Sequence, residues 1–162
     1  MNQCQQRTTI VSYVFIPVIV VLIALLGGII TSTNMDWYQT LELPAITPPG
    51  FVFSVAWTLI YALAAWTAII VWKKMDRCPC FGRMGVLFGL NALFNILWSY
   101  LFFGYHLIGW ALIDAILLEI IVILLMIAIY RKVSKTAIIL LVPYLIWGGF
   151  AIYINYLIWI LN

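Results

Sequence analysis

Apolar residues along this sequence fall into five long blocks separated by short polar segments. A helix needs about 20 apolar residues to cross the hydrocarbon core of a bilayer. Blocks of that length cover residues of about 8–32, 50–72, 84–104, 107–130 and 136–160. The pattern predicts an all-α integral membrane protein, a five-transmembrane-helix bundle. Because the first block is too long for a signal peptide and no polar block is left over, we expect 1–162 to be a single membrane domain.

Polar and aromatic residues recur at helical spacing inside four of these blocks. They are Trp57 and Tyr61; Asn91, Asn95, Trp98 and Phe102; Trp110 and Asp114; and Tyr144, Trp147, Ala151, Asn155 and Trp159. Unpaired polar groups are costly in hydrocarbon, so we expect the four stripes to face one another inside the bundle. For any one residue, an interface belt or a bond to a neighbouring helix is the favoured interpretation. Together, the indoles and amides predict a pocket for a flat aromatic ligand.

Composition and charge support a multi-pass membrane protein. Hydrophobic residues make up 67% of the chain and charged residues 8%, against about 45–50% and 25% in globular domains. All the cations fall in three clusters: Arg7; Lys73, Lys74, Arg77 and Arg83; and Arg131, Lys132 and Lys135. The positive-inside rule then predicts an N-terminus inside and a C-terminus outside. The net charge of +3 is explained by topology and anionic lipids rather than by nucleic acid.

Few other residues offer chemistry. Asp114 and Glu119 lie within one predicted span, but a five-residue spacing turns them about 140° apart, which excludes a paired-carboxylate site. An intramembrane acid is a functional hypothesis by default, and we expect Glu119 to be protonated or bonded to another helix or subunit. Cys78 and Cys80 without neighbouring ligands are a weak metal or redox signal. We therefore expect no metal site and no conventional catalytic residues.

Gly85 and Gly89 form a G-x-x-x-G pattern at the start of the third span. Small residues at that spacing let two helices approach closely in a membrane. The pattern predicts a homodimer contact.

Four ordered sequence blocks resemble the tryptophan-rich sensory protein/translocator protein family, also called the peripheral benzodiazepine receptor family. They are Trp37-Tyr38, Leu41, Pro44, Pro48-Pro49, Trp57 and Tyr61; "NALFNILWSYLFFG"; "GWALID"; and "PYLIWGGFAIYINYLIW". The resemblance covers nearly the whole chain. It implies a dimeric five-helix bundle with a ligand cavity beneath the connection between the first two helices, residues 33–49, which would act as a lid stiffened by prolines.

The resemblance also implies ligands and site residues. Family members bind porphyrins and other tetrapyrroles, isoquinoline- or benzodiazepine-like molecules and, in animals, cholesterol; no cofactor is required. Carried over position by position, the ligand-binding residues are Trp57, Asn95, Trp98, Trp110, Trp147, Ala151 and Ile46. The expected wall residues are Tyr61, Asn91, Phe102, Asp114, Tyr144, Phe150 and Asn155.

The chain departs from the family pattern in three places. Ile46 stands where many members have a loop tryptophan, and an aliphatic side chain cannot take part in the light-driven porphyrin breakdown linked to that indole. Asn91 stands where glutamine is common. Tyr156 is followed by no basic residue, so the animal cholesterol motif is absent. Ile46 therefore weakens an enzymatic interpretation more than a binding one.

The sequence is compatible with three functional hypotheses. The first is a membrane receptor that binds porphyrins in the bundle; the second is a light- and oxygen-dependent porphyrin-degrading enzyme. The third is a tetrapyrrole transporter, which the lack of an internal inverted repeat disfavours. The charge pattern and the missing sterol motif favour a prokaryotic plasma membrane.

Overall fold

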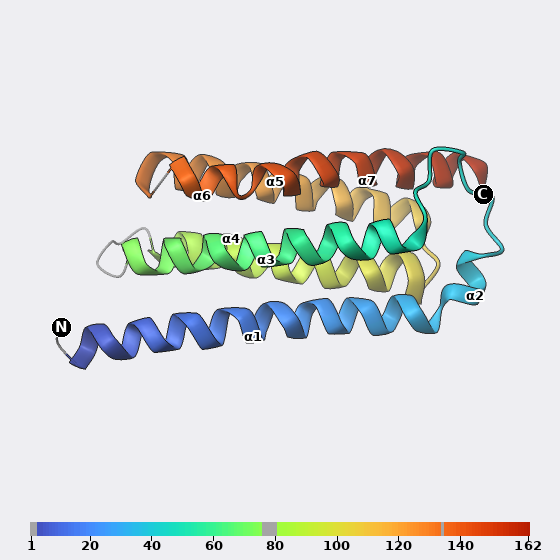
Figure 1. Ribbon diagram of the computed structural model, residues 1–162. Helices are drawn as coiled ribbons and strands as arrows, with labels where there is room; N and C mark the ends of the chain where they lie inside the picture. The colour runs from blue at the N-terminus through green and yellow to red at the C-terminus, as the bar shows by residue number, and fades with distance from the viewer. Residues whose placement is uncertain (1–2, 76–80, 134) are drawn as a thin grey trace.

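The computed structural model describes residues 3–75, 81–133 and 135–162. Its helices are α1 (Gln3–Thr33), α2 (Met35–Tyr38), α3 (Gly50–Met75), α4 (Phe81–Ser99), the π-helical η1 (Tyr100–Gly104), α5 (Ile108–Lys132), α6 (Lys135–Ile139) and α7 (Val142–Leu161) (Figure 1). The described part contains five helical spans long and apolar enough to cross a membrane. The predicted all-α, five-span fold is confirmed. Cys78 and Cys80 lie outside the described residues.

Two of the predicted helices are not continuous. The third span ends in the wide turn η1, where the Tyr105 N–H donates to the Tyr100 carbonyl at 2.8 Å. His106 then takes a left-handed backbone with φ of 58°, which reverses the chain within the short segment before α5. The fifth span is divided between α6 and α7, and Pro143 lies in the first turn of α7. Proline there has no N–H to continue a helix from α6, whereas it fits a new helix start.

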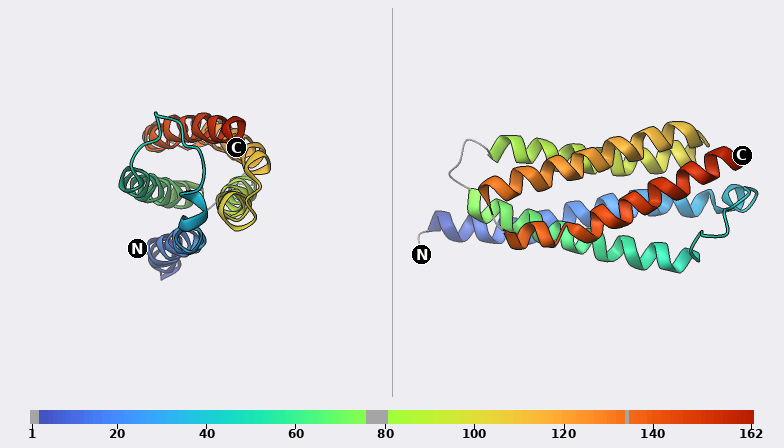
Figure 2. Two further views of the ribbon diagram at one scale, coloured as in Figure 1. Left: turned by 90° about the vertical axis from the view of Figure 1, so that its right-hand side faces the viewer. Right: turned by 90° about the horizontal axis from the view of Figure 1, so that it is seen from above.

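The long helices lie side by side around a shared interior (Figure 2). Helix α1 packs against α3 and α4, α5 packs between α4 and α7, and α3 meets α7 and α6. One apolar cluster centres on Val122, Leu125 and Leu141 towards the α6 end. A second, built around Phe102, Phe103 and Ile154, lies beneath the connection between α1 and α3. The N- and C-termini lie at opposite ends of the bundle (Figure 1).

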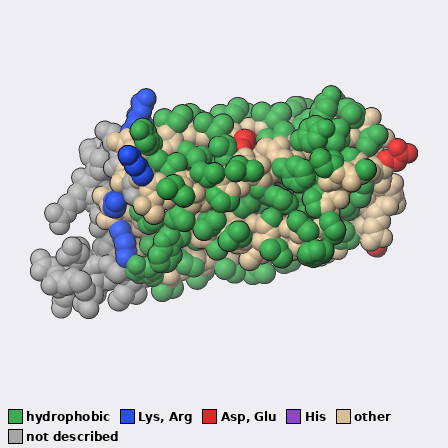
Figure 3. Space-filling model, turned by 45° about the horizontal axis from the view of Figure 1, so that its top comes forward, with side chains coloured by type: hydrophobic (Ala, Val, Ile, Leu, Met, Phe, Trp, Pro, Cys, Tyr) green, Lys and Arg blue, Asp and Glu red, His purple; other side chains and the backbone are tan. Residues whose placement is uncertain are grey.

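Most charged side chains lie at the two ends of the molecule. Lys and Arg side chains gather at one end and acidic side chains are visible at the other; the surface between them is largely apolar, with one small acidic area near its middle (Figure 3). The exposed cations of the described part are Lys73, Lys74, Arg83, Arg131 and Lys135. This separation is what a helix bundle needs if its middle lies in hydrocarbon and its ends in water.

Candidate functional site

A hydrogen-bonded layer crosses the middle of the bundle from α3 through α4 to α7. The amide of Asn91 donates to the Tyr144 hydroxyl at 3.0 Å, and the amide of Asn95 donates to the same oxygen at 2.6 Å. The Tyr61 hydroxyl donates to Asn95 Oδ1 at 3.3 Å. Helical spacing puts Asn91 and Asn95 on one face of α4, so both amides meet one phenol. Of the residues expected to face one another inside the bundle, Tyr61, Asn91, Asn95 and Tyr144 are brought together in this layer.

A second polar contact joins α4 and α7 nearer the α1–α3 connection. The indole N–H of Trp98 donates to Asn155 Oδ1 at 3.0 Å, and Asn155 Nδ2 donates to the Ile108 carbonyl at 3.1 Å. Asn155 therefore accepts from an indole of α4 and donates to the backbone at the start of α5, which links α4, α5 and α7. This pairing holds the Trp98 ring against Phe102, with centroids 5.2 Å apart and nearly parallel planes.

Aromatic rings of α3 and α7 face one another across the interior. Trp147 meets Phe53 edge-on at 5.6 Å between centroids and lies 5.4 Å from Phe150. One turn away, Trp57 meets Tyr144 edge-on at 6.0 Å. The Trp147 indole nitrogen is buried and has no hydrogen-bond partner among the described residues. A buried N–H without an acceptor is costly, so Trp147 offers an unused donor inside an aromatic wall.

The connection between α1 and α3 closes one end of this interior. Helix α2 lays Trp37 edge-on against Phe102, and Tyr38 packs near Phe103. The His106 ring stacks on the Trp37 ring, with centroids 3.9 Å apart. Burial in this cluster raises the pKa of Tyr38 above its ordinary value. Aromatic packing thus fixes the first part of the connection to the bundle.

The second part of the connection is tied to the C-terminal residue. The Glu42 N–H donates to Asn162 Oδ1 at 2.9 Å, and Asn162 Nδ2 donates to the Glu42 carbonyl at 3.1 Å. A turn follows, in which the Thr47 N–H donates to the Pro44 carbonyl at 2.9 Å. Ile46 lies in this turn and is 49% exposed. The predicted lid segment is therefore anchored at both α2 and Glu42, and Ile46 lies between that second anchor and α3.

Trp110 does not lie with the other predicted site residues. Its side chain is 63% exposed on the outer surface, whereas the adjacent Ala111 is fully buried. The buried face of α5 runs through Ala111, Asp114 and Leu118, and one residue turns a helix by about 100°. The prediction that Trp110 faces the interior is therefore wrong. It rested on a stripe of only two residues, Trp110 and Asp114, and only Asp114 is buried. Ala151, on α7, is partly buried as expected.

The two acids of α5 have different surroundings. Asp114 is 3% exposed, and neither carboxyl oxygen has a hydrogen-bond partner in the described part of the chain. Glu119 is partly buried against α7, where a Cβ added at Gly148 would collide with its Oε2 and lie 3.1 Å from its Cδ. Glycine at 148 is thus what lets the two helices pack around a carboxyl group.

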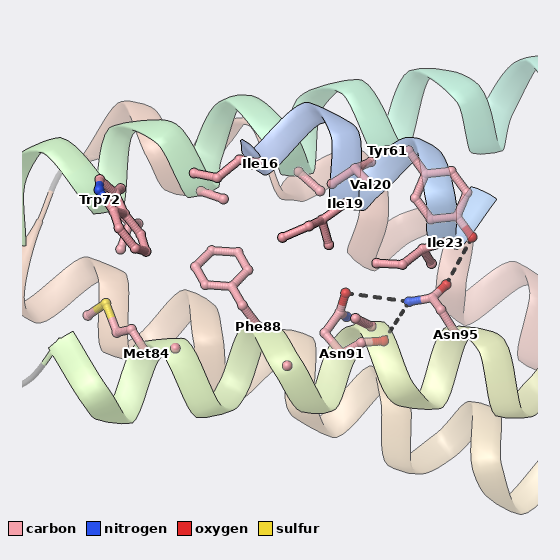
Figure 4. A pocket seen from close by; sticks show the side chains of 16 residues that line it. Ile16, Ile19, Val20, Ile23, Tyr61, Trp72, Met84, Phe88, Asn91 and Asn95 are labelled. Atoms are coloured by element: carbon pink, nitrogen blue, oxygen red, sulfur yellow. Dashed lines mark hydrogen bonds between the residues drawn. The ribbon is translucent and has the colours of Figure 1, made fainter. Parts of the chain in front are cut away.

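A cavity that the sequence did not predict lies between α1, α3 and α4 (Figure 4). Phe88 points into it, and the Asn91–Asn95–Tyr61 bonds lie at one end (Figure 4). Gly85 and Gly89 line it, are exposed, and have nothing within 4 Å of where a Cβ would stand. In the sequence, only the Gly85–Gly89 pair pointed to this surface, and it predicts a homodimer contact. That contact stays a prediction.

Comparison with known proteins agrees with this architecture. Residues 15–160 match the TspO/MBR family profile. The chain is 38% identical over 144 residues to a tryptophan-rich protein TspO of Archaeoglobus fulgidus, covering 88% of this chain and 92% of that protein. It is 37% identical over 142 residues to a protein of the same name from Chlorobaculum tepidum, covering 84% and 86%. A translocator protein of Sus scrofa is 33% identical over 145 residues, covering 85% of each chain. The chain therefore belongs to the TspO/MBR family of membrane proteins.

Proposed function

We propose that this protein binds porphyrins and related flat hydrophobic molecules within the helix bundle, beneath the connection between α1 and α3. The observation that carries the proposal is the Trp147 indole, whose buried N–H has no acceptor among the described residues. The donor groups of Asn91, Asn95 and Trp98 are already bonded. Trp147 therefore supplies the free donor that a porphyrin carboxylate or ring nitrogen accepts.

The rings around Trp147 suit the flat face of a macrocycle. Phe53 and Phe150 contact the indole, and Trp57 lies one turn along α3, against Tyr144. Aromatic pairs gain about 0.5–1.5 kcal/mol beyond burial, and a bound macrocycle replaces these ring contacts with contacts to its own surface. Entry requires the segment between Glu42 and α3 to move. We place this activity in a prokaryotic plasma membrane, in line with the archaeal and bacterial relatives.

The experiment is a titration of the detergent-solubilised protein with protoporphyrin in the dark, following the shift of porphyrin absorbance. Trp147→Phe keeps a ring but removes the N–H; a lost hydrogen bond of about 1 kcal/mol weakens binding about fivefold. Trp110→Phe is the matched control, since Trp110 lies on the outer surface, and it leaves affinity unchanged. Equal affinities of the two variants, or a greater loss in Trp110→Phe, would contradict the proposal.

A further inference from the structure

The cavity between α1, α3 and α4 has a volume of about 310 Å³, and its lining includes none of the rings of the α3–α7 aromatic wall. Its lining is almost entirely apolar: Ile16, Ile19, Val20 and Ile23 from α1; Ala64, Ala68, Val71 and Trp72 from α3; and Met84, Phe88 and Ala92 from α4, with Tyr61, Asn91, Asn95 and the two glycines. Figure 4 shows the aliphatic side chains of α1 opposite Phe88. Volume and lining are those of a site for a hydrophobic chain.

The polar groups at the inner end are already paired. Asn95 Nδ2 donates to Tyr144, Tyr61 donates to Asn95 Oδ1, and Asn91 Nδ2 also donates to Tyr144. An occupant therefore needs no polar group at this end, because the amides and phenols of the layer satisfy one another. This argues for a terminal methyl rather than a polar head at mid-bundle.

The other end of the cavity lies beside positive charge. Trp72 and Met84 line that end, and each adjoins a cation in sequence: Lys73 and Lys74 follow Trp72, and Arg83 precedes Met84. Arg83 is exposed. Lys73 donates to the Tyr13 hydroxyl and lies 4.0 Å from that ring's centroid, which fixes its cation between α1 and α3. An anionic head group at this position meets two helix ends carrying cations.

The length of the cavity matches one leaflet. Met84 and Asn95 are eleven residues apart on α4, which is about 16 Å of helix, or half of a hydrocarbon core of about 30 Å. The exposed Gly85 and Gly89 have no side chains to close the outer face of the groove. A lipid chain can therefore enter sideways from the bilayer without crossing the polar ends.

We propose that this cavity binds one acyl chain of an anionic phospholipid from the leaflet at the Lys/Arg end, with the phosphate beside Arg83 and Lys73. The cavity lining includes none of Phe53, Trp57, Trp147 and Phe150, which carry the porphyrin proposal, so either proposal can fail alone. A second copy of the chain seated on Gly85 and Gly89 is the alternative occupant, and the experiment below separates the two.

The test uses fluorescence quenching by lipids with brominated acyl chains in mixed micelles. Brominated phosphatidylglycerol is compared with phosphatidylcholine bearing the same chains, and Trp72→Phe isolates the signal of Trp72. Trp72 is quenched more by the anionic lipid, whereas Trp66, which is half-exposed elsewhere on α3, is quenched equally by both. Arg83→Gln lowers the preference of the Trp72 site for the anionic over the zwitterionic lipid about fivefold, which corresponds to about 1 kcal/mol for one cation.

Cavity-filling variants complete the experiment. Ala68→Leu fills the cavity from α3, leaves Gly85 and Gly89 unchanged, and makes the quenching of Trp72 equal for the two lipids. If that variant does not fold, Ala92→Leu fills the cavity from α4 with the same expected result. Gly149→Leu, a change at an exposed glycine outside the cavity, leaves the preference for the anionic lipid intact. Equal quenching of Trp72 by both lipids overturns the proposal. The proposal is also overturned if Trp72 is still quenched more by the anionic lipid in both filling variants, and if Gly89→Leu abolishes both that difference and a homodimer of the protein.

Discussion

Replacing Tyr144 by phenylalanine tests the polar layer that organises the interior. The ring and its contact with Trp57 stay, while one oxygen that accepts from both Asn91 and Asn95 is removed. Hydrogen bonds between membrane helices average about 0.6 kcal/mol, with a maximum of about 1.7. Two such bonds give an expected loss of about 1 kcal/mol in the free energy of unfolding, and up to about 3 if the Asn91 amide is left without an acceptor.

Two matched variants set the scale for that loss. Tyr61→Phe removes a single 3.3 Å bond to Asn95 and costs about 0.6 kcal/mol. Tyr153→Phe removes a hydroxyl from a half-exposed side chain on the same helix as Tyr144 and changes stability by less than about 0.5 kcal/mol. The expected order of destabilisation is therefore Tyr144→Phe, then Tyr61→Phe, then Tyr153→Phe.

The assay is unfolding in mixed micelles of increasing sodium dodecyl sulfate fraction, followed by far-ultraviolet circular dichroism. A double-mutant cycle with Asn95→Ala isolates the Asn95–Tyr144 coupling, expected to exceed about 0.5 kcal/mol. If Tyr144→Phe costs no more than Tyr153→Phe, the layer does not hold α4 and α7 together and the reasoning is refuted.

Two further predictions follow from the α5–α7 contact and from the connection between α1 and α3. Gly148→Ala lowers the free energy of unfolding by about 1–3 kcal/mol through overpacking against Glu119, whereas Gly149→Ala, which meets open space, stabilises α7 by up to about 1 kcal/mol. In a Glu119→Ala background the difference in stability between the two glycine variants disappears. If that difference persists in micelle unfolding, Glu119 is excluded as its cause. Because burial raises the pKa of Tyr38 in the folded state, its contribution to stability is complete below about pH 10 and is lost as pH rises through the raised value. Unfolding followed against pH should therefore show a weaker alkaline loss in Tyr38→Phe than in the unaltered chain, and identical profiles would exclude Tyr38 as a source of that loss.

The spans and the one-sided cations could be predicted because both depend on composition along the chain. The α4 stripe was also accessible, since Asn91 and Asn95 are polar among apolar neighbours and only one face can pair them. The position of Trp110 could not be predicted correctly because lipid and protein interior are equally apolar. An aromatic residue in a membrane span therefore does not indicate whether it faces lipid or the protein interior.

Other features depend on contacts that no local pattern encodes. The bonds between Glu42 and Asn162 join residues 120 positions apart, and the turn η1 is revealed by backbone hydrogen bonds rather than by a motif. The cavity beside Phe88 is lined by residues as apolar as those facing lipid. The cavity depends on how α1 packs against α3 and α4. Hydrophobic periodicity does not specify this packing.

The most direct test of porphyrin binding within the bundle is an experimental structure of the protein with protoporphyrin bound in the dark. We expect the macrocycle between α3 and α7, with its face against Trp57 and a porphyrin acceptor within hydrogen-bond distance of the Trp147 indole nitrogen. The Phe53–Trp147 edge contact would then be opened. A macrocycle bound on the outer surface beside Trp110, or in the groove of Gly85 and Gly89, with the α3–α7 rings still in contact, would contradict it.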